Sequence, residues 1–311
     1  MPDPSPDAGR IARAAASAWW KAHGSGRGEI PLGVVAALAL TERADPDGPD
    51  PASQILAADR DQTADLLRDI WTLFAIIRPE LSIRTGPFAA WLDNPSAAQL
   101  DGAHATARAV ATAGLLSQTA DRRRARDMDL LGVVYQELRN PKAGKTRGEV
   151  YTPAALAAAM ARLTVSGAEP GQSICDPCAG TGGLLLAAAT QLRSQGIEPG
   201  SMHWYAADID PIAVAGLAVN AHLWDLGPHV VIGRADTLAE PDWHARALSE
   251  QQTAIEHHNA QVTIARFLAA TALLGAAAEA ASDQQGPHGS GPGITTQGGK
   301  RPCPSPDSST A

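Results

Sequence analysis

The chain has 311 residues, enough for one large domain or two small ones, and its hydrophobic content of 44% is ordinary for a soluble globular protein. Its formal net charge is -8 at pH 7. This acidic balance gives no support to free-standing DNA binding, because phosphate contacts draw their affinity from Lys and Arg. It leaves open a DNA-acting enzyme whose basic groups are local or come from a partner.

The first residues, Met1 to Asp7, are acidic and rich in proline, so they lack the basic and apolar regions of a signal peptide. The longest apolar run, Phe267 to Ala278, is shorter than the roughly 20 residues that are needed to span a bilayer. We therefore expect a cytoplasmic protein that does not engage a membrane.

The sequence contains three cysteines, Cys175, Cys178 and Cys303, which are too few for a disulfide framework. The first two have the spacing of a redox pair or of half a zinc site. No second pair of ligands accompanies them, and both lie inside the glycine-rich segment described below. We therefore expect no metal, and a redox or zinc role is the less favoured alternative.

Residues 1–125 are predicted to form a mostly α-helical N-terminal domain, with breaks at 24–28 and 45–51, where Gly, Pro and Asp gather. Apolar residues recur near helical spacing in this part, which indicates a packed face. Trp19 and Trp20 could form a platform for base stacking. The favoured interpretation is that they anchor a helix to the core.

Two basic runs flank a short helix that is predicted over residues 129–138. The first run holds Arg122, Arg123, Arg124 and Arg126, and the second holds Lys142, Lys145 and Arg147. Either run could contact phosphates, and either could be a solvated helix face. Both interpretations stay open.

The segment from Ser173 to Leu186 predicts a strand, a tight turn and a helix. An apolar run over residues 172–175 reaches Asp176, a glycine-rich turn follows, and an Ala/Leu-rich helix is expected over 183–194. Gly180 and Gly182 allow backbone conformations that other residues avoid and let a ligand approach bare main chain. The helix N-terminus behind them offers unpaired N–H groups. Asp176 is expected either to accept a hydrogen bond from a ligand or to brace the loop.

Two further strands are predicted over residues 203–207 and 229–232, with a helix over 211–224 between them. Asp210 and Pro211 suit the N-cap and the first position of that helix. Strand–helix–strand units in series predict a parallel sheet with helices on its faces.

Ligands of such sheets bind at the carboxyl ends of the strands, where Asp176, Asp208 and Asp236 should converge. Asp208 follows the second strand at the position where nucleoside-binding folds keep the carboxylate that takes the ribose hydroxyls. A loop acid that caps the next helix is the alternative for Asp208, and an ordinary turn residue is the alternative for Asp236.

Four segments in this order, Gly148 to Pro153, Ser173 to Leu186, Ala207 to Pro211 and Gly233 to Leu238, resemble the S-adenosylmethionine-binding half of the adenine-N6 DNA methyltransferases. The resemblance covers residues 127–243 and is greatest to the modification subunit of type I restriction systems. It implies an α/β fold, a Rossmann-like methyltransferase core with a parallel sheet and flanking helices.

This core is predicted over residues 126–248, after the helical N-terminal domain. A Gln- and Ala-rich helical segment should follow over 249–282, and the low-complexity tail, 283–311, should be disordered.

The resemblance implies S-adenosylmethionine as the cofactor. The implied contacts are Tyr151, Thr152, Pro153, Asp176, Ala179, Gly180, Gly182, Asp208, Ile209, Asp236 and Thr237. Tyr151 to Pro153 would touch the methionine end, and Asp236 would read the adenine amino group. Thr152 also suits a helix N-cap with Pro153 in the first helical position, which needs no ligand.

The family's catalytic turn, Asn/Asp-Pro-Pro-Tyr/Phe, is absent, since the sequence contains no Pro-Pro dipeptide. No catalytic residue is therefore assigned. The leading hypothesis is an adenine-N6 DNA methyltransferase, or its cofactor-binding portion, that acts on DNA, expected to be double-stranded, with a specificity or catalytic partner subunit. The alternatives are a degenerate cofactor-binding or DNA-associated accessory protein and a small-molecule methyltransferase with the same fold.

Overall fold

The computed structural model describes residues 6–24, 26–41, 50–139 and 151–283, with side chains from 7 up to 273. The second basic run, the Gly148 lead-in to Tyr151, Cys303 and the predicted disordered tail lie outside these residues, apart from the first residue of the tail, which still belongs to a helix. The chain divides into two compact units, Met1–Asn259 and Ala260–Ala311.

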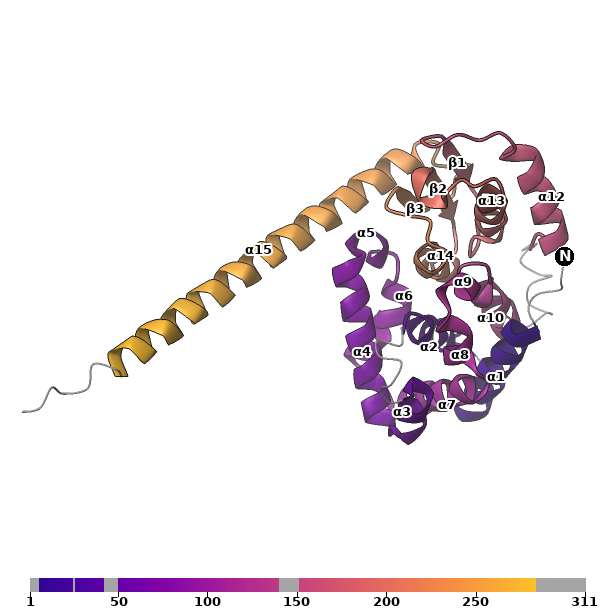
Figure 1. Ribbon diagram of the computed structural model, residues 1–311. Coiled ribbons are helices and arrows are strands. Elements are labelled where there is room, and N and C mark those ends of the chain that lie inside the picture. Colours follow the sequence, from indigo (N-terminus) through magenta and orange to yellow (C-terminus); the bar gives the residue numbers. More distant parts are fainter. Residues whose placement is uncertain (1–5, 25, 42–49, 140–150, 284–311) are drawn as a thin grey trace, which may run out of the picture. The chain divides into compact units, whose positions relative to one another are not determined.

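The described part of the first unit up to residue 138 is helical, as predicted (Figure 1). Its elements are α1 (Pro6–Ala22), α2 (Glu29–Ala39), α3 (Pro51–Ala57), α4 (Arg60–Ile77), α5 (Pro79–Ser82), α6 (Gly86–Ala89), the 3-10 helix η1 (Ala90–Asp93), α7 (Ala97–Thr112), α8 (Leu115–Thr119), α9 (Arg122–Ala125) and α10 (Leu130–Leu138). Side chains fix several of these starts: Asp59 and Ser96 form capping boxes at α4 and α7, and Asp129 caps α10.

The helix α1 packs against α7 and α10 and is anchored by Trp19. This side chain is fully buried, and its indole N–H donates to the Gly26 carbonyl at 2.9 Å. Trp20 is 42% exposed. The predicted anchoring role is therefore confirmed for Trp19, whose ring is not available to stack on a base.

The sheet has three parallel strands in the order β1 (Ser173–Asp176), β2 (His203–Asp208) and β3 (Val230–Arg234). Its helices are α12 (Ala154–Thr164), α13 (Gly183–Ser194) and α14 (Pro211–Leu223), with the 3-10 turn η2 (Pro199–Ser201) before β2. The predicted parallel α/β arrangement is confirmed, with strand ends shifted by one or two residues. Asp210 caps α14 and Pro211 opens it, as predicted.

The helix α14 joins the sheet to the N-terminal helices. It packs against β2 and β3 and also against α2, α6 and α10. Its residues from Ala213 to Ala221 are all buried, which explains why they are almost entirely apolar. One cluster of buried side chains consequently runs from α1 through α14 into the sheet.

The helix α15 (Trp243–Asp283) includes the segment predicted to be helical, 249–282, and begins before it. Trp243 explains the earlier start, because it packs into a small core with Ala207, Val231 and Ala235. Within the second unit, the helix exposes Ile264, Phe267 and Leu268. None of the helices in the described parts of the chain is long and apolar enough to cross a membrane.

The predicted capping role of Thr152 is wrong. The helix α12 begins at Ala154, and Pro153 occupies the N-cap with an extended ψ of 140° and no side-chain cap. The Pro153 carbonyl accepts the Leu156 and Ala157 N–H groups at 2.9 Å. Proline suits this place because the N-cap residue contributes its carbonyl to the helix and needs no N–H of its own.

Gly182 is held in place by packing. Its φ is +98°, and a Cβ atom there would lie 2.6 Å from Leu217 Cδ1 and 2.8 Å from Trp224 Cζ3. The residue therefore lets α13 start directly against α14.

We expect Gly182→Ala to lower the free energy of unfolding by about 2–4 kcal/mol, since backbone strain and overpacking add together. Gly196→Ala is the matched control, because Gly196 has φ +78° and a Cβ atom added there would meet nothing within 4 Å. It should lose only the backbone contribution of about 1–2 kcal/mol. Urea denaturation measures both, and equal losses would contradict the packing role.

Candidate functional site

The glycine-rich turn after β1 is fastened to the end of β2. The Ala179 N–H donates to the Ala207 carbonyl at 2.8 Å, and the Gly180 N–H donates to Asp208 Oδ2 at 2.8 Å. Behind the turn, the fully buried Asn220 donates from Nδ2 to the Thr181 carbonyl at 2.8 Å. Asn220 was not singled out from the sequence, because a lone Asn in an apolar helix carries no motif.

Asp208 organises both loops that it touches. Its Oδ1 atom accepts the Asp210 N–H at 2.9 Å, in addition to the Gly180 bond on Oδ2. The helix itself is capped by Asp210, whose Oδ1 atom accepts the Ile212 N–H at 2.8 Å. An ionised carboxylate has about four acceptor positions, and these two bonds leave about half of them for a ligand.

Asp176 braces the turn from inside. Its side chain is buried, and Oδ1 accepts the Cys178 N–H at 3.1 Å. Burial raises the pKa of Asp176, and the nearby charge of Asp208 adds to the rise, while the Cys178 N–H opposes it. Of the two roles considered for Asp176, these contacts favour bracing the loop.

The turn after β3 reaches the turn after β1. The Thr237 hydroxyl donates to the Pro177 carbonyl at 3.1 Å. Asp236 is exposed, and its Oδ1 atom accepts the Leu238 N–H at 3.2 Å. The loops that follow all three strands are thus connected by hydrogen bonds at one rim of the sheet.

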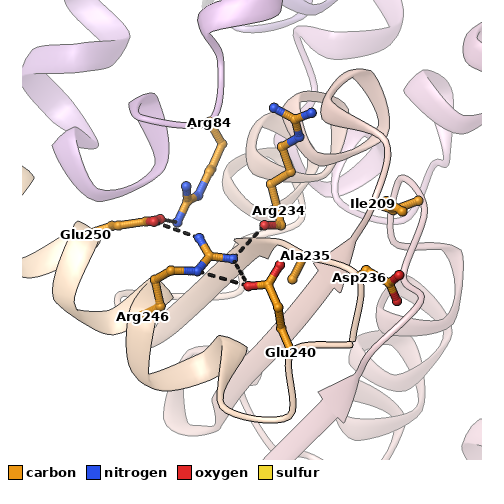
Figure 2. A pocket seen from close by; sticks show the side chains of 8 residues that line it. All are labelled: Arg84, Ile209, Arg234, Ala235, Asp236, Glu240, Arg246 and Glu250. Atoms are coloured by element: carbon orange, nitrogen blue, oxygen red, sulfur yellow. Dashed lines mark hydrogen bonds and ion pairs between the residues drawn. The ribbon is translucent and has the colours of Figure 1, made fainter. Parts of the chain in front are cut away.

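A cavity of about 590 Å³ opens beside this rim (Figure 2). Its lining consists of Arg84, Ile209, Arg234, Ala235, Asp236, Glu240, Arg246 and Glu250. The volume is in the range of about 300–1,000 Å³ that small-molecule sites occupy. Of the predicted site residues, Ile209 and Asp236 line it, and Ile209 is 65% exposed.

One wall of the cavity is an ion-pair network. Arg246 bonds Glu240 at 2.8 Å and Glu250 at 2.7 Å, and Arg84 bonds Glu250 at 2.5 Å. In Figure 2 these side chains meet, whereas the guanidinium of Arg234 extends away from them. Arg84 comes from the connection between α5 and α6, far from α15 in sequence. The sequence around Arg84 did not indicate that it lines this cavity.

Tyr151 lies next to the glycine-rich turn. A Cβ atom added at Gly180 would be 4.0 Å from Tyr151 Cε1, and the ring meets Tyr135 edge to face at 6.0 Å. The Tyr135 hydroxyl donates to Asp210 Oδ2 at 2.5 Å, and Arg139 pairs with the same carboxylate. Tyr135 and Arg139 therefore link α10 to the loop after β2, a connection that the sequence did not indicate.

The two glycines of the turn differ in surroundings. Gly180 has φ +56° and no neighbour closer than Tyr151, whereas Gly182 is packed against α14. Gly180 thus presents open main chain. The structure brings Tyr151, Asp176, Ala179, Gly180, Asp208 and Thr237 around one turn, and places Ile209 and Asp236 at the adjoining cavity. Thr152 and Pro153 are exposed at the start of α12.

The sheet, its helices and this rim fit the predicted α/β methyltransferase fold. Residues 126–262 match the family model described as N-6 DNA Methylase. This segment contains all four motifs, so the resemblance to the adenine-N6 DNA methyltransferases that the motifs predicted is confirmed.

Among solved structures, the chain is similar to the type I restriction-modification system methyltransferase subunit from Streptococcus thermophilus, with 15% identity and a TM-score of 0.45. The match covers 76% of this chain and 59% of that subunit, so the chain spans less than two thirds of its length. No curated protein matches the sequence.

Asp129 is a partly buried acid at the N-cap of α10, close to the first residue of α13. Its Oδ1 atom accepts the Gly132 N–H at 3.0 Å, and Oδ2 lies 3.9 Å from the position of a Cβ on Gly183, the first residue of α13. Burial raises the pKa of Asp129 from 3.8 to about 6, against the Gly132 hydrogen bond. The protonated form is therefore the one that the fold favours.

We expect Asp129 to make the wild-type fold less stable as pH rises. A carboxyl group with a raised folded pKa stabilises the fold fully below its unfolded pKa of about 4 and loses this contribution as pH rises through about 6, by about 2–3 kcal/mol in total. Asp129→Asn keeps a capping oxygen and removes the titration. The difference in unfolding free energy between Asp129→Asn and wild type should grow by that amount between pH 4 and pH 7.5.

Denaturation across this pH range measures the difference, and titrations shared by both proteins, such as that of His222, cancel. A difference that does not change with pH would contradict the assignment.

Proposed function

We propose that the chain binds S-adenosylmethionine at the rim of the sheet and serves adenine-N6 methylation of DNA. The observation that carries this proposal is the set of bonds between the three strand-end loops, Gly180 to Asp208 and Thr237 to Pro177, around the open main chain of Gly180. Such a rim is where parallel α/β sheets bind nucleosides.

The residues present fit this cofactor. The remaining acceptor positions of Asp208 suit ribose hydroxyls, and the exposed side chain of Ile209 offers an apolar face for adenine. Asp236 can accept a hydrogen bond from the adenine amino group at the cavity wall. Tyr151, beside Gly180, would hold the methionine end, with Thr152 and Pro153 next to it.

When bound, the cofactor supplies an electrophilic methyl group. The residues of this chain would bind and orient it, and positioning of this kind can supply much of the rate of a transfer between two bound reactants. A group that polarises the target amino group is not assigned, since the sequence lacks the Pro-Pro turn that the family uses there.

That missing turn favours a second candidate, in which the chain is a cofactor-binding or accessory component whose partner subunit completes the site. DNA, most simply double-stranded, is the proposed substrate in either case. Exposed arginines on α9, Arg123 and Arg124, are candidate phosphate contacts.

We expect isothermal titration to detect S-adenosylmethionine binding and to find it about fivefold weaker in Ile209→Ala, because roughly 1 kcal/mol of apolar contact is lost. Ile209 is already exposed, so the fold should not suffer. Leu73→Ala on α4, where Leu73 is 55% exposed, is the matched control and should bind like wild type.

Asp208→Ala should bind about tenfold more weakly or worse, because charged hydrogen bonds to the ribose are lost. Because Asp208 also bonds Gly180, the thermal melting of the Asp208→Ala variant is measured in parallel with that of wild type. Binding is compared at a temperature where both proteins are folded. Equal affinities of Asp208→Ala and wild type would refute the ribose assignment.

The second candidate is tested by incubating the pure chain with methyl-labelled cofactor and mixed double-stranded DNA. Label on adenine N6 would establish a self-sufficient methyltransferase and exclude the accessory role. Cofactor binding without transfer is the expected result if a partner completes the site, and neither binding nor transfer would refute both candidates.

A further inference from the structure

The two outer edges of the sheet differ in whether side chains bond to their outward backbone groups. On the outer edge of β3, three side chains donate to successive outward carbonyls: Gln251 to Val230 at 2.8 Å, Arg84 to Ile232 at 2.8 Å, and Arg246 to Arg234 at 2.9 Å. These bonds replace the partners that a further strand would provide, so the edge of β3 is closed.

The outer edge of β1 has no such cover within the described residues. The Gln172 carbonyl accepts the His203 N–H of β2, and the N–H and C=O groups of successive residues alternate in direction along a strand. Ser173 and Cys175 therefore direct their N–H and C=O groups away from β2. None of the described residues outside the β1–β2 ladder bonds to them, and both side chains are exposed.

The two edge strands also differ in how far their side chains are buried. From Val230 to Gly233, every residue of β3 is buried, whereas Asp176 is the sole buried residue of β1. Parallel strands are usually covered on both faces, so exposure at β1 is unusual for this kind of sheet. Among the described residues, the core is complete on the β3 side and open on the β1 side.

A second exposed apolar surface lies on α12. The helix α12 packs against α13, and in Figure 1 it lies on the outer side of that helix. Its residues Leu156, Met160 and Leu163 are 52%, 41% and 84% exposed. Their spacing of four and three residues places them on one helix face, where apolar side chains indicate a contact surface.

We propose that the outer edge of β1 binds an extended segment of a separate polypeptide as an added strand. A row of outward N–H and C=O groups is matched along its length only by another extended backbone. The segment should be apolar or β-branched and should not be acidic, because Asp176 ends β1, Asp208 ends the neighbouring β2, and the chain carries a net charge of -8.

The direction of β1 gives this surface a consequence for the site. A strand parallel to β1 would bring the residues after its own carboxyl end to the glycine-rich turn. A partner bound in this way could supply the polarising group that the chain lacks, and this consequence, unlike the edge itself, rests on the proposed function.

The test uses a fluorescent peptide, Lys-Val-Thr-Val-Thr-Val-Lys, and the full chain, with binding measured by anisotropy without cofactor. The control peptide has the same sequence with alternate backbone nitrogens methylated, which removes its donors. Wild type and Cys175→Ser should bind the first peptide alike and the second not at all.

Cys175→Pro should weaken binding of the first peptide at least about fivefold, since it removes an outward N–H donor and obstructs the edge of β1. Proline is tolerated at an edge where its N–H faces solvent, so the β1–β2 ladder is retained. Ser173→Pro, at the first residue of the strand, is the second variant in case the first one does not fold. Thermal melting checks both.

Failure of wild type to bind the peptide, or equal binding by the folded proline variants, would overturn the proposal. Sedimentation of wild type alone gives a further outcome: a dimer that Cys175→Pro abolishes would make a second copy the occupant and would also overturn it. Cofactor titration is run on the same proteins. Peptide binding without cofactor binding would refute the proposed function and leave the edge assignment standing.

Discussion

The hydrogen bond from the Gly180 N–H to Asp208 is the interaction on which the site depends. It joins the turn after β1 to the end of β2, and the second oxygen of the same carboxylate holds the Asp210 N–H. The bond helps to hold the backbone at Gly180, together with the Ala179 to Ala207 bond beside it. The Asp208 carboxylate thus supports the turn and still has acceptor positions for a ligand. A structural role for Asp208 therefore does not exclude a binding role.

The rim is supported from the helical half of the chain as well. Tyr135 of α10 and Arg139 just after this helix bond to Asp210, and Arg84 bonds to the carbonyl of Ile232 in β3. Asn220 of the buried α14 bonds to the turn after β1 from behind. Removal of the N-terminal helices would therefore expose α14 and release the loops at the rim. The helical part is a structural element of the site, whatever it binds.

The fold was predictable from the sequence because each of the first two strands is followed by a short turn and an apolar helix, a pattern that permits few topologies. The contacts of Arg84, Tyr135 and Asn220 could not be predicted, since each joins segments distant in sequence and none belongs to a motif. Thr152 failed as a cap because Thr-Pro fits a helix start in two registers, and the sequence alone does not choose between them. A motif match likewise gives Gly180 and Gly182 the same role. Their surroundings distinguish the two roles, because Leu217 and Trp224 fill the space beside Gly182, whereas the space beside Gly180 is open.

The contrast between the sheet edges connects the fold to the missing catalytic turn. Three side chains from two distant segments donate hydrogen bonds to the outward carbonyls of β3 and so close this edge. No described residue does the same at β1, although this edge ends at the turn on which the site is built. An open edge leaves backbone groups with water as their partner, and it exposes the strand to nonspecific pairing. An added strand at this edge would complete the sheet from outside and would lead directly to the glycine-rich turn.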